Sequence, residues 1–204
     1  MKTLPEPIAQ ILEECRSNLT SRGELLASDR LKIYQKIEEF CANENSNDFE
    51  YQMAKLELTC AWKVLNILED CDLTDNSARE LLELAERFLQ GEVEEKELEE
   101  RRTDFFYSQA EHLMDNKEEY FTAVYAAFAC FSATKVVLSG FELPAFGQPE
   151  IEVDPDAWTA AFLASMAYCG GATWEKGVGD DLKRREFWEW FLNEAVPSLW
   201  VGKA

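Results

Sequence analysis

The sequence is poor in basic side chains and in the residues that carry most enzyme chemistry. Twenty lysines and arginines stand against 40 aspartates and glutamates, which gives a net charge of −20, and the only histidine is His112. Phosphates and anionic lipid headgroups would be repelled by such a chain, so independent binding to nucleic acid or to a membrane is not expected. A basic protein is a compatible partner.

Motifs of catalysis and of cofactor binding are also missing. The sequence has no glycine-rich phosphate loop, no GxSxG elbow, no HExxH pair and no aspartate-rich calcium loop. The Glu-x-x-His pair of di-iron helical bundles is absent, because Gln109 stands three residues before His112. We therefore predict no catalytic residue, no metal site and no cofactor, and expect a binding protein rather than an enzyme.

The cysteines are scattered and form no CxxC pair. The chain opens with Met1–Lys2 and two early prolines, without the apolar block of a secretory signal. Disulfide frameworks belong to short secreted chains, so we expect reduced thiols, mostly buried on helices, in a cytoplasmic protein. The six cysteines are Cys15, Cys41, Cys60, Cys71, Cys130 and Cys169.

Apolar residues recur at three-to-four spacing along most of the chain, and no segment alternates with a period of two. With 47% hydrophobic residues, the pattern predicts an all-α, single compact domain of about eight helices over residues 1–204. The predicted helices cover residues 7–20, a segment capped by Ser28 or Asp29, 49–69, a segment ending before Gly91, a segment from the following glutamates to Leu113, 120–138, 157–169, and a last one from Asp180 or Asp181 to Pro197.

Two of these segments, 120–138 and 157–169, are apolar around nearly their whole circumference and rich in alanine. The first is long enough to span a membrane. Its many alanines, and the lack of a second segment of that length, instead favour a helix that packs closely on several neighbours. We expect these two to be the central helices of the core.

A run of six glutamates is the strongest polar feature. Such a run can be a solvated face that keeps the protein soluble, or a landing site that attracts and orients a basic partner. Charge is uneven, because residues 1–119 hold 29 acidic and 14 basic residues, a net −15, whereas 120–204 hold 11 and 6, a net −5. This imbalance favours a binding protein. The glutamates are Glu92, Glu94, Glu95, Glu97, Glu99 and Glu100.

The segment from Ala167 to Trp200 is the most distinctive part of the chain. Helical spacing predicts that Trp190 points inward and that Trp188 lies nearer the boundary, where its indole N–H can reach a partner. The basic residues 183–185 are expected to form ion pairs. Their expected partners are Asp154, Asp156 and Glu175.

Residues 154–200 resemble immunity-protein family five of bacterial polymorphic toxin systems. The resemblance lies in the DPDAW start, a helix ending AYCGGATWE, the RREFWEW helix and the final EAVPSLW. It implies an all-helical protein that binds and neutralises a cognate secreted toxin. The glutamate run is not a feature of that family. The matching residues are Gly170, Gly171, Trp174, Glu175, Arg184, Arg185, Glu186, Phe187, Trp188, Glu189 and Trp190.

Two interpretations follow. The first is an immunity protein that occludes a toxin, with acidic residues facing a basic surface. The alternative is an acidic helical protein with an internal small-molecule pocket, or an enzyme without a familiar motif. A buried pocket that gathers Glu175, Arg184 or Arg185 with tryptophans would favour the alternative.

Overall fold

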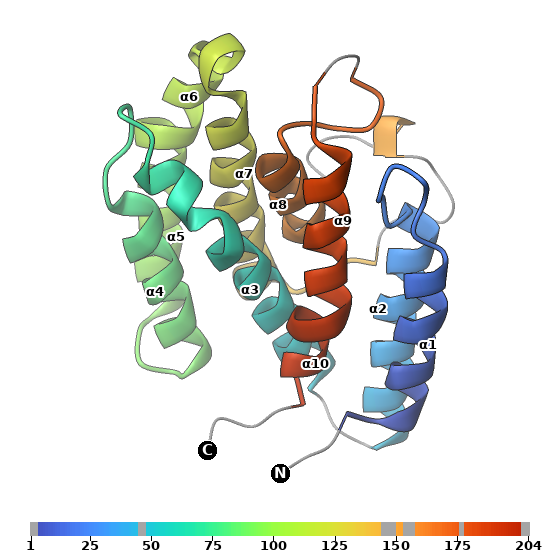
Figure 1. The fold of residues 1–204 in the computed structure, drawn as a ribbon. Helices are drawn as coiled ribbons and strands as arrows, with labels where there is room; N and C mark the ends of the chain where they lie inside the picture. The colour runs from blue at the N-terminus through green and yellow to red at the C-terminus, as the bar shows by residue number, and fades with distance from the viewer. Residues whose placement is uncertain (1–3, 45–47, 144–149, 153–157, 176–177, 201–204) are drawn as a thin grey trace.

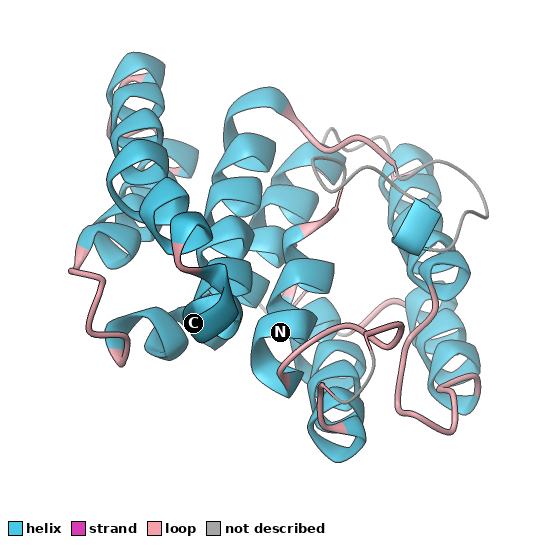
Figure 2. Cartoon of the chain, turned by 90° about the horizontal axis from the view of Figure 1, so that it is seen from above, coloured by secondary structure: helices cyan, strands magenta, loops and turns pink. Residues whose placement is uncertain are grey.

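The computed structural model describes residues 4–44, 48–143, 150–152, 158–175 and 178–200, and these form helices and connecting loops without a strand (Figures 1 and 2). The all-α prediction is therefore confirmed. The longer helices are α1 (Glu6–Ser17), α2 (Ala27–Asn43), α3 (Phe49–Glu69), α4 (Ser77–Leu89), α5 (Glu95–Phe105), α7 (Lys117–Ser139), α8 (Ala160–Cys169) and α9 (Asp181–Trp190). The short ones are α6 (Glu111–Asp115), α10 (Val196–Ser198) and the 3-10 turn η2 (Glu150–Glu152).

Two helices contain π turns that the sequence pattern did not predict. The turn η1 (Phe106–Ala110) joins α5 to α6, and η4 (Phe191–Ala195) joins α9 to α10. Pro197 was expected to end the last helix, and the continuous run α9–η4–α10 ends one residue beyond it, at Ser198. Proline lacks the N–H that would continue the hydrogen bonds of the helix.

The start of α2 also differs from the prediction. Its N-cap is Leu26, and neither Ser28 nor Asp29 caps it. Asp29 lies one turn further in and is buried, where its carboxylate accepts hydrogen bonds from Asn18 (3.2 Å) and Lys32 (2.9 Å). The carboxylate is engaged by side chains and does not bind the first N–H groups of α2.

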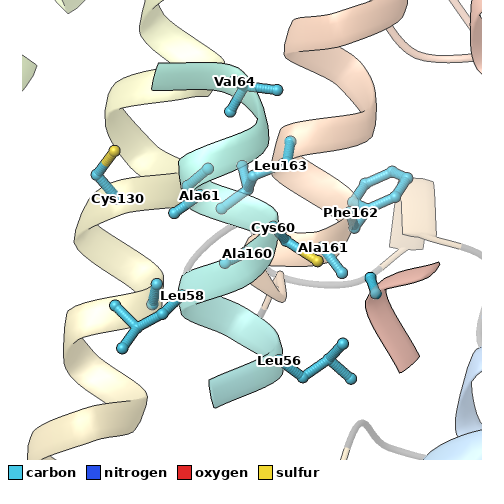
Figure 3. Close-up of a cluster of buried hydrophobic side chains, with 14 of the residues drawn as sticks. Leu56, Leu58, Cys60, Ala61, Val64, Cys130, Ala160, Ala161, Phe162 and Leu163 are labelled. Carbon is cyan, nitrogen blue, oxygen red and sulfur yellow. The ribbon is translucent and has the colours of Figure 1, made fainter. Parts of the chain in front are cut away.

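The core is centred on α3, with α7 and α8 packed against it (Figure 3). Small residues line the contact and let the helix backbones approach closely, as the alanine-rich composition predicted. One cluster of buried side chains runs from Ile8 to Trp200 and includes all of these helices. The fully buried small residues of α7 and α8 are Ala126, Ala127, Ala129, Cys130, Ala133, Ala160, Ala161 and Ala164.

Helix α7 passes the length and composition test for a membrane span over Glu119–Ser139, and it is the one helix to do so among the described residues. Half of that window is buried inside the molecule. Because the buried half faces α3 and α8, the apolar character of α7 is largely explained by its central place in the core.

The cysteines are free, and all but Cys71 are buried. Burial raises the pKa of the Cys15 and Cys130 thiols to about 12 and raises that of Cys169. A thiol that stays protonated and shielded is a poor nucleophile. The expectation of small core residues is confirmed for five of the six.

A buried carboxyl group caps the first turn of α8. Glu57 of α3 is completely buried, and its Oε2 accepts hydrogen bonds from the backbone N–H groups of Ala160 and Ala161. Burial raises the pKa of Glu57 to about 7, although the two N–H bonds lower it. The other oxygen, Oε1, and the Tyr34 hydroxyl have no hydrogen-bond partner among the described residues.

The titration of Glu57 leads to a pH prediction. In the unfolded chain this group ionises near its ordinary pKa of 4.5, but in the folded protein it ionises only near 7. Glu57 therefore favours the folded state most below pH 4.5, and about 3 kcal/mol of that advantage is lost as the pH rises to 7. Urea denaturation of wild type and Glu57→Gln should show the variant gaining on wild type between pH 5 and pH 8. Parallel profiles would contradict the raised pKa.

Candidate functional site

The guanidinium of Arg184 is buried and bonds to three different residues. Arg184 lies in the first turn of α9 and is 1% exposed. Its Nη2 donates to the Gly171 carbonyl (3.0 Å), and its Nε lies 3.3 Å from the carboxylate of Glu24. Its Nη1 also bonds to Asp181 (2.5 Å). Each of the three guanidinium nitrogens of Arg184 thus has an oxygen partner, and such partners offset the cost of burying a charge.

Glu24 joins this cation to a second one and to an indole. Its Oε1 accepts a hydrogen bond from Trp188 Nε1 (3.1 Å) and lies 3.7 Å from Arg30. Arg30 itself donates to the Leu25 carbonyl (2.6 Å), and its guanidinium stacks over the ring of Trp188, 5.1 Å from the centroid. We call Glu24, Arg30, Asp181, Arg184 and Trp188 the arginine cluster.

The arginine cluster fastens the loop after α8 to the loop between α1 and α2. Arg22 donates to the Thr173 carbonyl and forms an ion pair with Asp181 (3.3 Å). Arg185 donates to the Thr20 carbonyl (2.8 Å). Two segments about 150 residues apart in the chain are therefore held by cationic side chains that bind carbonyl groups.

Two glycines make this close approach possible. Gly23 has φ +76°, and a Cβ there would lie 2.7 Å from the backbone N of Arg185. Gly179 has φ +83°, and a Cβ would lie 2.5 Å from the Arg184 guanidinium. Both positions combine a left-handed backbone with a lack of space, so only glycine fits without strain.

The structure corrects the predicted orientation of two tryptophans. Trp188 is fully buried, and Trp190 is only half-buried, with Lys63 4.7 Å above its ring. The spacing of apolar residues along α9 does not show that two charged residues, Glu24 and Arg30, are buried beside it. These residues accept the indole of Trp188 in the interior. The expectation that the Trp188 N–H finds a partner is confirmed.

Of the predicted ion-pair partners, Glu175 is not bound to Arg184 among the described residues. Arg184 binds Glu24 and Asp181, whereas Glu175 accepts from the Ala172 N–H (2.7 Å) and from the Tyr125 hydroxyl (3.4 Å). Asp154 and Asp156 lie outside the described residues. Glu24 and Arg30 carry no local sign of burial, and Glu24 depends on Arg184 and Trp188, which are far away in the sequence. Sequence reasoning therefore missed both.

The other family-motif residues surround the arginine cluster. Gly171 and Phe187 are buried, and the rest are half-buried or exposed. Trp174 lies beside Phe162, with ring centroids 5.9 Å apart, on the side of α8 that faces Arg30. The buried motif residues, which include Arg184 and Trp188, support the fold, whereas Glu186 and Glu189 are exposed.

The glutamate run lies elsewhere, at the turn between α4 and α5. All six glutamates are exposed. Glu92 forms an ion pair with Arg87 (3.6 Å) and Glu100 with Lys96 (3.4 Å). In the part of the chain that the structure describes, no ion pair within 4.0 Å engages the remaining four, Glu94, Glu95, Glu97 and Glu99.

A cavity of about 380 Å³ opens where α3, α7, α8 and α9 meet. None of its lining residues is a tryptophan, Glu175, Arg184 or Arg185, so it does not have the composition that the small-molecule interpretation predicted. Its lining consists of Asn66, Ile67, Thr122, Ala167, Tyr168, Cys169, Gly170 and Lys183.

Comparison with protein families places this helical chain among the immunity proteins. Residues 11–198 match the family model described as immunity protein Imm5, so the chain belongs to the Imm5 family. The match extends far beyond residues 154–200, which carry the resemblance in the sequence. It includes all five residues of the arginine cluster, from Glu24 to Trp188. A comparison with curated proteins gives no match.

The arginine cluster makes Arg184 a test of stability. Arg184→Ala should lower the free energy of unfolding by about 3–5 kcal/mol, because it removes a cationic partner of the buried Glu24 and the N–H donor of the Gly171 carbonyl. Lys183→Ala, at an exposed neighbouring position, should change it by less than about 0.5 kcal/mol. Chemical denaturation followed by circular dichroism measures both. Similar small losses would show that the cluster contributes little.

The two tryptophans should differ in the same assay. Trp188→Ala removes a fully buried indole and should cost about 3–5 kcal/mol. Trp190→Ala removes a half-buried ring and its contact with Lys63, and should cost about 1–2 kcal/mol. Glu189→Ala is the exposed control between them. If Trp190→Ala lowers the free energy of unfolding more than Trp188→Ala does, the face of α9 that carries Trp188 is not the one packed in the core.

Proposed function

We propose that this protein is a cytoplasmic immunity protein that binds a cognate bacterial toxin and blocks it sterically, with residues 1–204 acting as one domain. The observation that carries the proposal is membership of the Imm5 family over residues 11–198. The protein acts by occupying the toxin's functional surface and performs no chemistry of its own. The inward-facing motif residues support this mechanism, because they stabilise a scaffold whose outer faces are left for recognition.

We further propose that the toxin surface is basic. The chain carries a net charge of −20, and no ion pair within the described part of the chain engages four exposed glutamates at the start of α5. An acidic surface of this kind accelerates the approach of a basic partner and orients it, even where the final contacts are few. The chain needs no metal or cofactor for this role.

The test is protection by the intact protein. Co-expression should rescue bacterial cells from the toxin encoded beside the gene of this chain, and the two purified proteins should form a complex in which the mass of each is unchanged. Cells that die despite ample soluble protein would overturn the proposed function. A toxin with a changed covalent mass after contact would show that the protein is an enzyme.

Neutralising the exposed glutamates tests whether their charge speeds the approach of the toxin, separately from the contacts made in the final complex. Replacing Glu94, Glu95, Glu97 and Glu99 together by glutamine should slow association with the toxin about tenfold at low salt and flatten its salt dependence. Folding should be unaffected, because exposed glutamates that repel one another contribute little to stability. Stopped-flow mixing over a range of salt concentrations gives both quantities.

A matched control has the same change in net charge on the other side of the molecule. Glutamines at four exposed positions of α1 and α2, which lie far from α4 and α5 in Figure 1, should leave the salt dependence close to that of wild type. If both variants slow association equally, only total charge matters and the glutamate run is a solvated face. The control positions are Glu13, Glu14, Glu38 and Glu39. Three of them, Glu13, Glu14 and Glu39, form surface ion pairs, so circular dichroism must first show that this variant is folded.

A further inference from the structure

The outer face of α7 carries aromatic side chains that the core covers only in part. Phe121, Tyr125 and Phe128 are spaced by four and three residues, so they lie within about 60° of one another on the helix. They are half-buried, whereas the alanines on the opposite side of α7 are completely buried against α3 and α8. A helix buried on one side would ordinarily have polar residues on the other.

The π turn η1 extends this aromatic face beyond α7. Tyr107 is 64% exposed, more than any other described aromatic residue, and its ring packs edge-on against Phe106 at 5.3 Å. Phe106 in turn contacts Phe128 (6.4 Å) and Phe131 (5.0 Å) of α7. We call Phe106, Tyr107, Tyr125, Phe128 and Phe131 the aromatic strip. A π turn is rare and is found frequently at functional sites, because it turns side chains away from the register of the surrounding helix.

Acidic side chains border the aromatic strip on two sides. On α5, helical spacing places Glu95 and Glu99 on the same flank as Arg102 and Phe106. On the far side of α7, Glu175 accepts a hydrogen bond from the strip residue Tyr125 at 3.4 Å. Aromatic faces and nearby carboxylates both attract cations, so the two features act in the same direction.

The protein itself contains an example of this chemistry at the edge of the strip. The guanidinium of Arg102 lies 3.6 Å from the centroid of the Phe131 ring, and its Nε donates to the Phe131 carbonyl at 3.3 Å. Burial lowers the pKa of Arg102, and the charge of Glu99 opposes that shift. Arg102 thus shows that a partly buried guanidinium can lie on an aromatic ring of this surface with an acidic residue, Glu99, nearby.

We propose that the aromatic strip is the docking surface for the toxin, and that the exposed ring of Tyr107 and the uncovered edges of its neighbours receive arginine or lysine side chains of a basic toxin surface, as the Phe131 ring already receives Arg102. This inference rests on the proposed function and names the face that performs it. Aromatic residues are enriched at protein interfaces and at their energetic hot spots. A second copy of this chain is a poor occupant, because each copy carries a net charge of −20. The same charge opposes an anionic membrane.

The experiment measures the affinity of purified wild type and variants for the toxin encoded beside the gene, by titration calorimetry. Tyr107→Lys should weaken binding at least about tenfold, because it removes a ring and adds a charge that repels the toxin. Tyr107→Phe keeps the ring and should stay within about twofold of wild type. Tyr107 is exposed, so circular dichroism should show both variants folded.

The matched control is Tyr51→Lys. Tyr51 is 46% exposed in the first turn of α3, next to Glu50, whose carboxylate binds the Phe141 N–H just beyond the C-terminal end of α7. This variant has the same charge change on a comparably exposed tyrosine, and it should bind within about twofold of wild type.

The outcomes are separable. Wild type that does not bind overturns the proposed function and the docking surface with it. Wild type that binds, with Tyr107→Lys no weaker than Tyr51→Lys, overturns the docking surface alone. If sedimentation instead shows that wild type is a dimer and Tyr107→Lys a monomer, the occupant is a second copy and the assignment to a basic toxin is wrong.

Discussion

The buried guanidinium of Arg184 bonds to three separate parts of the chain: the loop after α8, the loop between α1 and α2, and the first turn of its own helix. A lone buried cation would be strongly unfavourable, so the position of each of these segments depends on the others. Trp188 and Arg30 complete the arrangement from two further sides of Glu24. The cluster orders the end of the molecule where α1, α2, α8 and α9 meet.

The centre of the molecule depends on a different constraint. Helices α7 and α8 approach α3 closely because alanines face one another, and the one buried acidic group there caps the start of α8. Small residues leave little freedom for rearrangement. The large aromatic residues of α7 are consequently on its outer face, and this arrangement produces the aromatic strip.

The sequence predicted the helices well and their polar contacts poorly. Periodicity located α3 with the correct ends and identified α7 and α8 as central, since burial of an apolar stripe leaves a local pattern. Burial of Glu24 and Arg30 leaves none, because Glu24 is accepted in the interior through Arg184 and Trp188, which are distant in the chain. The same limit explains Trp188, whose partner is Glu24. The π turn that exposes Tyr107 is equally invisible to a fixed period of 3.6 residues.

The contacts that the arginine cluster makes between the α1–α2 loop and α9 also have a consequence for synthesis of the protein. Residues 20–24 leave the ribosome long before residues 184–188 exist, so the carboxylate of Glu24 lacks two of its partners until α9 has been synthesised. Contacts of such large sequence separation form late and slow folding. A nascent or truncated chain that lacks α9 would therefore have α1 and α2 without their final packing, and native structure at this end of the molecule would form only after α9 has been translated.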